Sequence, residues 1–133
     1  MKSPFFIFLF FLLLLIAGLH ITGIELFWYW RFSFFDILVH TLSGMWISGM
    51  VVWFFSLSPY GRGQEKSRGR VFLIALLVTL GIGLAWEVFE IAVGATFIWY
   101  EHYLLDTILD VLADMMGAFL IFLYFSLNIS KKQ

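Results

Sequence analysis

The sequence predicts an all-α, polytopic membrane protein in which a bundle of four transmembrane helices forms one domain over residues 1–133. Composition is the first reason: 62% of the residues are hydrophobic and 13% charged, whereas soluble domains are about half apolar and about one-quarter charged. Distribution is the second, because the apolar residues form long runs, and about 20 such residues cross a bilayer as a helix. A soluble fold of this size could not bury so much apolar surface, so we expect lipid to cover it.

Four segments have the length and composition of membrane spans. The first covers about 4–26, where Pro4 is acceptable because proline is tolerated in the first turn of a helix. The second covers about 35–57 and stops at the turn-forming stretch SPYGRG. The third and fourth cover about 71–96 and 105–127. A cleaved signal peptide is the alternative for the first segment, but its apolar run is long and lacks a convincing small-residue cleavage site.

The basic residues indicate the orientation of the spans. Four spans place both termini and the 58–70 loop on one side of the membrane, and the other side then holds only Arg31. The basic residues of the first side are Lys2, Arg62, Lys66, Arg68, Arg70, Lys131 and Lys132. The positive-inside rule therefore predicts that both termini are cytoplasmic. An aromatic belt is expected at the outer interface, formed by Trp28, Tyr29, Trp30, Trp99, Tyr100 and Tyr103.

Acidic residues and a histidine recur at helical spacing in the outer halves of three spans. Asp36 and His40 are four residues apart at the start of the second span. Glu87 and Glu90 are three residues apart near the end of the third. The fourth span begins with a row of aspartates at Asp106, Asp110 and Asp114. Residues three or four apart share one face of a helix, so each span presents a polar stripe at the same depth, and we expect the stripes to converge inside the bundle.

Carboxylates placed in hydrocarbon need compensation. Each costs about 2.5–3.5 kcal/mol near a helix centre, and no Lys or Arg lies within the four segments. A bound metal ion, shared protons, a protonated His40 or a cationic substrate could supply it. Carboxylates with an imidazole suit a divalent ion such as Mg²⁺, Mn²⁺ or Zn²⁺. The predicted metal ligands are Asp36, His40, Glu87, Glu90, Asp106, Asp110 and Asp114, of which His40, Glu87 and Asp110 are the predicted catalytic residues.

Other readings of these residues stay open. Asp36 and Asp106 begin helices, where a carboxylate can simply cap the free N–H groups. Protonated carboxyl groups could also hold the helices together through hydrogen bonds. His20 and Glu25 lie near the same end of the first span and could join the site, although an interfacial charge and a satisfied polar residue explain them as well. The small residues predict close helix approach, at Gly44 and Ser48, Gly81 and Ala85, and Gly117 and Ala118.

Three stretches carry a family resemblance: FDILVHTLSG (35–44), WEVFEIAVG (86–94) and YLLDTILDVLADMMGA (103–118). They resemble the YjdF-like small inner-membrane proteins and, more distantly, the VanZ-like family. In both, an Asp-x-x-x-His opens one span, a Glu-rich stretch closes the next, and an Asp-rich motif ending in Gly-Ala opens the last. VanZ-like proteins more often carry Asn at the position of Asp114, which favours the YjdF-like family. The resemblance implies a multi-pass protein of the bacterial inner membrane and points to the cell envelope, but it supplies no reaction.

Three functions fit these observations. The first is a metal-dependent membrane hydrolase or transferase acting on a lipid or lipid-linked substrate, although only Arg31 is near the outer face to hold a phosphate. The second is a transporter or binding protein for protons or cations, which would need to form a homo-oligomer to build a pathway. The third is a structural or regulatory membrane subunit. The chain has no cysteine, which excludes disulfides and thiolate sites, and its one basic run lacks the interleaved aromatics of a nucleic-acid site.

Overall fold

The computed structural model describes residues 4–61, 67–94 and 101–129, and all regular secondary structure in these ranges is helical. The helices are α1 (Pro4–Glu25), the short α2 (Trp28–Arg31), α3 (Phe34–Val52), α4 (Arg68–Val93) and α5 (Tyr103–Tyr124). A π-helical turn extends α3 (η1, Trp53–Leu57) and another extends α5 (η2, Phe125–Ile129). Four helices are long and apolar enough to cross a membrane, which confirms the predicted fold class: α1, α3 with η1, α4, and α5 with the start of η2.

The bounds of the third span differ from those read off hydropathy. α4 begins three residues before the predicted start, because the Ser67 hydroxyl accepts a hydrogen bond from the Arg70 N–H (3.4 Å) and so caps a first turn that carries charge. It ends at Val93, because Gly94 takes the left-handed conformation (φ 73°) that terminates helices. Residues 95–96, which the prediction included, lie outside the described ranges. Capping geometry, rather than apolarity, sets both ends.

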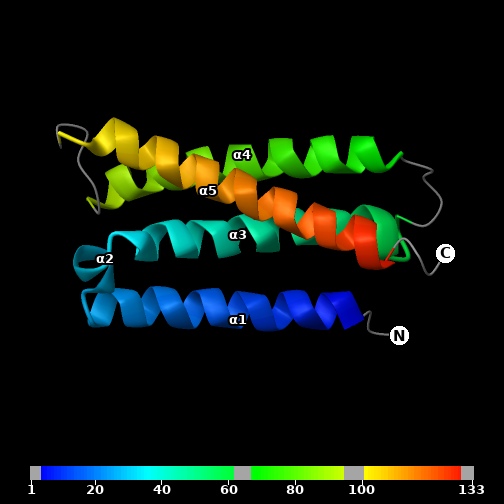
Figure 1. Cartoon of the computed structure of the whole chain (residues 1–133), viewed down its shortest axis with the longest axis horizontal. Coiled ribbons are helices and arrows are strands. Elements are labelled where there is room, and N and C mark those ends of the chain that lie inside the picture. Colours follow the sequence, from blue (N-terminus) through cyan, green and yellow to red (C-terminus); the bar gives the residue numbers. More distant parts are fainter. Residues whose placement is uncertain (1–3, 62–66, 95–100, 130–133) are drawn as a thin grey trace.

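α3 is the central helix of the bundle. It packs against α1, α4 and α5, and α4 also packs against α5 (Figure 1). The apolar core occupies the end where both chain termini lie, away from α2 (Figure 1). Its buried members are Phe5, Leu9, Leu12, Val52, Val71, Ile121 and Phe125. In a bilayer such contacts act through close van der Waals packing, since lipid is as apolar as the side chains themselves. This packing fixes the helices at one end and leaves the other end for polar residues.

Apart from Arg31 in α2, the described basic residues lie at the opposite end of the bundle from the residues of the predicted aromatic belt. Trp28, Tyr29 and Trp30 form α2, and Tyr103 opens α5 at the same end, whereas Arg68 and Arg70 are exposed in the first turn of α4 at the other end (Figure 1). Several residues of the predicted belt and of the basic side lie outside the described ranges: Trp99, Tyr100, Lys2, Arg62, Lys66, Lys131 and Lys132. The described residues thus keep the separation that the orientation prediction requires.

Two glycines allow α3 and α5 to touch. A Cβ on Gly44 would collide with the backbone of Asp114, and one on Gly117 would collide with the carbonyl of Thr41. The close approach predicted at Gly44 and Gly117 is therefore confirmed, and the contact sets Asp114 of α5 beside the first turns of α3.

The prediction for Gly81 and Ala85 was wrong. Both residues are exposed, and a Cβ on Gly81 would have no neighbour within 4 Å. The close contact of α4 is at Gly83, where a Cβ would lie 2.6 Å from Asp114 Oδ2. Two residues rotate a helix by about 200°, so Gly81 faces away from the bundle while Gly83 faces it.

These contacts predict that substitution by alanine has different effects at the packed glycines and at the exposed one. Gly44→Ala and Gly117→Ala should each lower the melting temperature by several degrees, because a methyl group against a backbone cannot rotate away and overpacking costs about 1–3 kcal/mol. Gly81→Ala, the matched control, should be neutral or slightly stabilising, because alanine favours helix over glycine by about 1 kcal/mol. Thermal unfolding in detergent, followed by tryptophan fluorescence, measures all three. Equal melting temperatures would contradict the packing.

Candidate metal centre

The predicted ligands gather at the α2 end of the bundle. Asp36 and His40 lie in the first two turns of α3, and Asp110 and Asp114 lie on α5. Of the predicted ligands, four residues are buried: His40, Glu87, Asp110 and Asp114. Asp36 and Glu90 are partly buried, and Asp106 is exposed in the first turn of α5. Neither α3 nor α5 has a side-chain hydrogen bond at its N-cap, so capping is not what holds this end of the bundle together.

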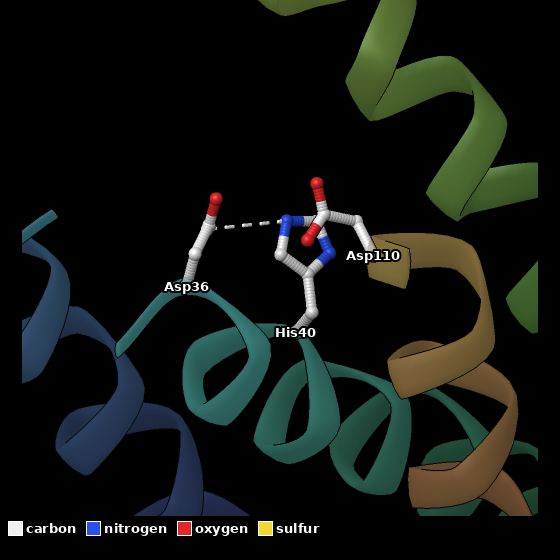
Figure 2. A group of neighbouring side chains, drawn as sticks. All are labelled: Asp36, His40 and Asp110. Carbon is white, nitrogen blue, oxygen red and sulfur yellow. Dashed lines mark ion pairs between the residues drawn. The ribbon is translucent and has the colours of Figure 1, made fainter. Parts of the chain in front are cut away.

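Asp36, His40 and Asp110 form a compact group. One ligand atom from each lies within 4.8 Å of the other two (Figure 2). His40 Nε2 is 3.6 Å from Asp36 Oδ1 on the same helix, and Asp110 reaches the group from α5. Ligands about 2.0–2.2 Å from a shared ion lie about 3–3.5 Å from one another. Small rotations of the side chains would therefore bring all three onto one ion.

The second ring nitrogen of His40 meets a buried carboxylate. His40 Nδ1 and Asp114 Oδ2 are 3.4 Å apart, and the same oxygen fits against the backbone of Gly83 on α4. With its proton on Nδ1, the ring donates to Asp114 and turns the lone pair of Nε2 toward Asp36. This carboxylate–histidine arrangement is how proteins commonly orient a histidine that binds metal. Asp114 thus lies where it orients His40, outside the group of three.

Glu87 is next to this group but has a different partner. Its Oε2 accepts a 2.7 Å hydrogen bond from the Thr107 hydroxyl on α5, while its buried Oε1 has no hydrogen-bond partner among the described residues. A buried carboxylate oxygen without a donor is costly, so this oxygen is available to a ligand or a proton. Sequence reasoning missed Thr107, although it is three residues before Asp110 and so shares its face.

A second polar group joins α1, α2 and α4. The Trp86 N–H donates to Glu90 Oε1 (2.8 Å), and His20 Nδ1 and the Tyr29 hydroxyl share a 2.7 Å hydrogen bond. The ring centres of His20 and Trp86 are 6.0 Å apart, which links α1 to α4. His20 therefore lies in the site region with its Nδ1 hydrogen-bonded to Tyr29, whereas Glu25 is exposed at the end of α1.

The sequence placed Tyr29 only in the interfacial belt. It reaches inward because Phe27 adopts a left-handed backbone conformation (φ 58°) and turns the chain back over the bundle. Such a conformation is rare for a bulky residue, and no sequence pattern here signals it.

A cavity of about 320 Å³ lies between α1, α3 and α4. Its polar lining residues are His20, Tyr29, Asp36, His40, Ser43, Glu90 and Asp114. Asp36 and His40 of the group of three thus open onto this cavity, while Asp110 supports them from α5. The arrangement can hold a cation at the cavity wall and present it to a second molecule inside.

Comparison with known families agrees with this architecture. Residues 2–131 match the sequence model of a family described as a predicted membrane protein (DUF2238). The chain belongs to the DUF2238 family. This is the YjdF-like family, so that identification is confirmed, while the relation to VanZ-like proteins stays a prediction. No curated protein and no solved structure matches the chain. The description of the DUF2238 family gives a membrane location and no activity, so the geometry must supply the function.

The surroundings of Tyr29 predict that its hydroxyl ionises at a higher pH than an ordinary tyrosine does. Burial, and then the charges of Asp36 and Glu90, raise the pKa of the Tyr29 hydroxyl well above the usual value for tyrosine. The folded protein then holds this proton more tightly than the unfolded chain does, so stability should fall as the pH rises above about 10. Tyr29→Phe should flatten that dependence.

Alkaline absorbance titration of the folded protein measures the ionisation of Tyr29. The difference between wild type and Tyr29→Phe should show no tyrosinate signal near pH 10. A normal signal there would contradict the placement of Tyr29.

Proposed function

We propose that this DUF2238 protein is a multi-pass membrane protein that binds one divalent metal ion through Asp36, His40 and Asp110. The observation that carries the proposal is the group of three itself, in which two helices bring ligand atoms within 4.8 Å of one another. Among the described residues the basic side chains are Arg31, Arg68 and Arg70, and all are exposed near helix ends. No Lys or Arg of the described residues is therefore available inside to balance these acids, and a divalent ion would balance them.

The ligand types favour Zn²⁺ or Mn²⁺ over Mg²⁺. Imidazole suits Zn²⁺ and other transition metals, whereas Mg²⁺ prefers oxygen ligands and retains several waters. Two carboxylates match the charge of a divalent ion. Three protein ligands leave at least one coordination position free, as in catalytic rather than structural zinc sites. Because Asp36 and His40 line the cavity, the free position would face it.

A free coordination position supports the enzyme among the candidate functions. An ion there would polarise an oxygen of a lipid or lipid-linked substrate, or activate a water. Glu87 is the proposed base, because its buried Oε1 has no partner among the described residues. Transport has less support: on the described helices every buried acid and histidine lies toward the α2 end. Below them the buried polar side chains are serine and threonine hydroxyls, which do not form a proton relay.

We also propose that the α2 end faces outward from the bacterial inner membrane and that both termini are cytoplasmic. The support is the charge distribution: both termini and the loop between α3 and α4 share a side, and that side carries every Lys and Arg except Arg31. This orientation would put the metal site within the outer leaflet, where it could reach envelope lipids.

Substitution of the ligands should lower bound metal. After purification in detergent and loading with Zn²⁺ or Mn²⁺, wild type should hold about one ion per chain. His40→Ala and Asp110→Asn should each weaken binding by tenfold or more, because each removes one of three ligands. Asp114→Asn should weaken it by about 10–100-fold, because the acceptor of the His40 ring loses its negative charge. Plasma mass spectrometry after dialysis measures the metal content.

Asp106→Asn is the matched control, since Asp106 is one turn before Asp110 on the same helix but exposed. It should keep the full metal content. Added metal should raise the melting temperature of wild type and of Asp106→Asn, but not of the double variant His40→Ala, Asp110→Asn. Equal metal content and equal stabilisation in wild type and the double variant would overturn the metal proposal.

Single cysteines test the orientation, because the chain has none of its own. An impermeant maleimide added to intact spheroplasts should label Glu101→Cys, at the exposed α2 end. It should label Ser67→Cys, at the exposed start of α4, only after lysis. The reverse pattern would show that the site lies in the cytoplasmic leaflet.

A further inference from the structure

The cavity between α1, α3 and α4 has two different ends. The end near α2 carries acids and aromatic rings, while the inner end is lined by Leu13, Ile16, Ile47 and Ile82. Along α3 the lining extends from Asp36 to Ile47, a rise of about 16 Å. A volume of about 320 Å³ is in the range of small-molecule sites. The shape thus fits a long molecule with one polar end and one apolar end.

Acidic side chains lie at the polar end of the cavity. Asp36, Glu90 and Asp114 line it, and none of the lining residues is Lys or Arg. Both lining histidines already have partners, His20 in Tyr29 and His40 in the carboxylates of Asp36 and Asp114. A divalent ion on Asp36, His40 and Asp110 would balance two carboxylates and still leave Glu90 and Asp114. The complementary ligand therefore carries a positive charge at its polar end.

Aromatic rings surround the same end. Tyr29 and Trp86 line the cavity there, and the faces of such rings attract ammonium groups. The Trp86 N–H holds Glu90 through Oε1, so the carboxylate is oriented while Oε2 is left to other partners. Acids combined with aromatic rings recognise an organic cation better than an anion such as phosphate.

The cavity is reached from the side of the bundle. α1 and α4 flank α3 and each packs against it (Figure 1). The cavity is lined by residues of all three helices. Three of its lining residues are partly open to the surroundings: Leu13 (39% exposed), Ile82 (47%) and Trp86 (38%). They belong to membrane-spanning helices, so this opening faces hydrocarbon and a membrane lipid could enter it sideways.

We propose that this cavity binds a membrane lipid whose headgroup carries a primary ammonium, with the ammonium between Glu90 and the rings of Tyr29 and Trp86 and an acyl chain along Leu13, Ile47 and Ile82. The proposal does not depend on the metal site, because the carboxylate that it places at the ammonium, Glu90, is outside the group of Asp36, His40 and Asp110.

Lipid selectivity in native mass spectrometry tests the proposal. The full chain in neutral detergent is mixed with phosphatidylethanolamine and phosphatidylglycerol that have identical acyl chains. Wild type should retain the ethanolamine lipid several-fold more. Glu90→Gln keeps the shape and the acceptor for Trp86 but removes the charge, so it should weaken binding of that lipid about tenfold and leave the glycerol lipid unchanged. Ile82→Trp should weaken both lipids by filling the apolar end.

Glu25→Gln is the matched control, because it removes an exposed acid from the same end of the bundle; it should leave lipid binding unchanged. Metal content measured on the same samples separates this proposal from the previous one: Glu90→Gln should lose lipid selectivity and keep its ion. Melting temperatures identify any variant that fails to fold. Equal selectivity in wild type and Glu90→Gln, or a preference of wild type for the glycerol lipid, would overturn the proposal.

Discussion

The contacts of Asp114, on α5, with α3 and α4 organise the functional end of this molecule. Gly44 and Gly117 let α3 and α5 approach until backbone meets backbone, and Gly83 lets the carboxylate of Asp114 reach α4. The same carboxylate meets His40 Nδ1. A larger residue at any of these glycines would push the helices apart and separate His40 from Asp110. The geometry of the candidate metal centre is therefore a consequence of how closely these helices pack.

The two ends of the bundle have different roles. Near the termini, Leu9, Val52 and Ile121 are buried in an apolar core that holds α1, α3 and α5 together. Near α2, buried acids replace apolar residues, and α1 and α4 enclose a cavity instead of closing on each other. An apolar residue at each of these polar positions would satisfy a membrane fold better. The α2 end is therefore less stable than an apolar packing would be. This is expected of a functional site, where residues are chosen for binding a ligand rather than for stability.

Much of the fold and of the candidate site could be predicted from the sequence, because long apolar runs and helical spacing indicate them. Long apolar runs predicted the four spans, and the four-residue spacing of Asp36 with His40 and of the aspartates around Asp110 predicted all three members of the group. The other features of the site depend on the rotation of each helix about its axis and on turn geometry, which residue spacing does not determine. Gly81 and Gly83 are equivalent in a small-residue pattern, yet only Gly83 faces Asp114. Tyr29 reached the cavity through a left-handed turn at Phe27 that hydropathy cannot show.

The proposed metal ion and ammonium lipid would each balance negative charge, at two different places near the α2 end. The first lies at Asp36 and Asp110, where carboxylates and an imidazole are close enough to share a small ion. The second lies at Glu90, held by an indole and bordered by rings, where a larger organic cation fits better than a metal. In a low-dielectric interior neither cation substitutes for the other, because an ion needs several ligand atoms at about 2 Å whereas an ammonium needs one acceptor and an aromatic wall. If both bind, the headgroup of the lipid lies beside the free coordination position of the metal, and the cavity has the geometry of a substrate site rather than of a simple anchor.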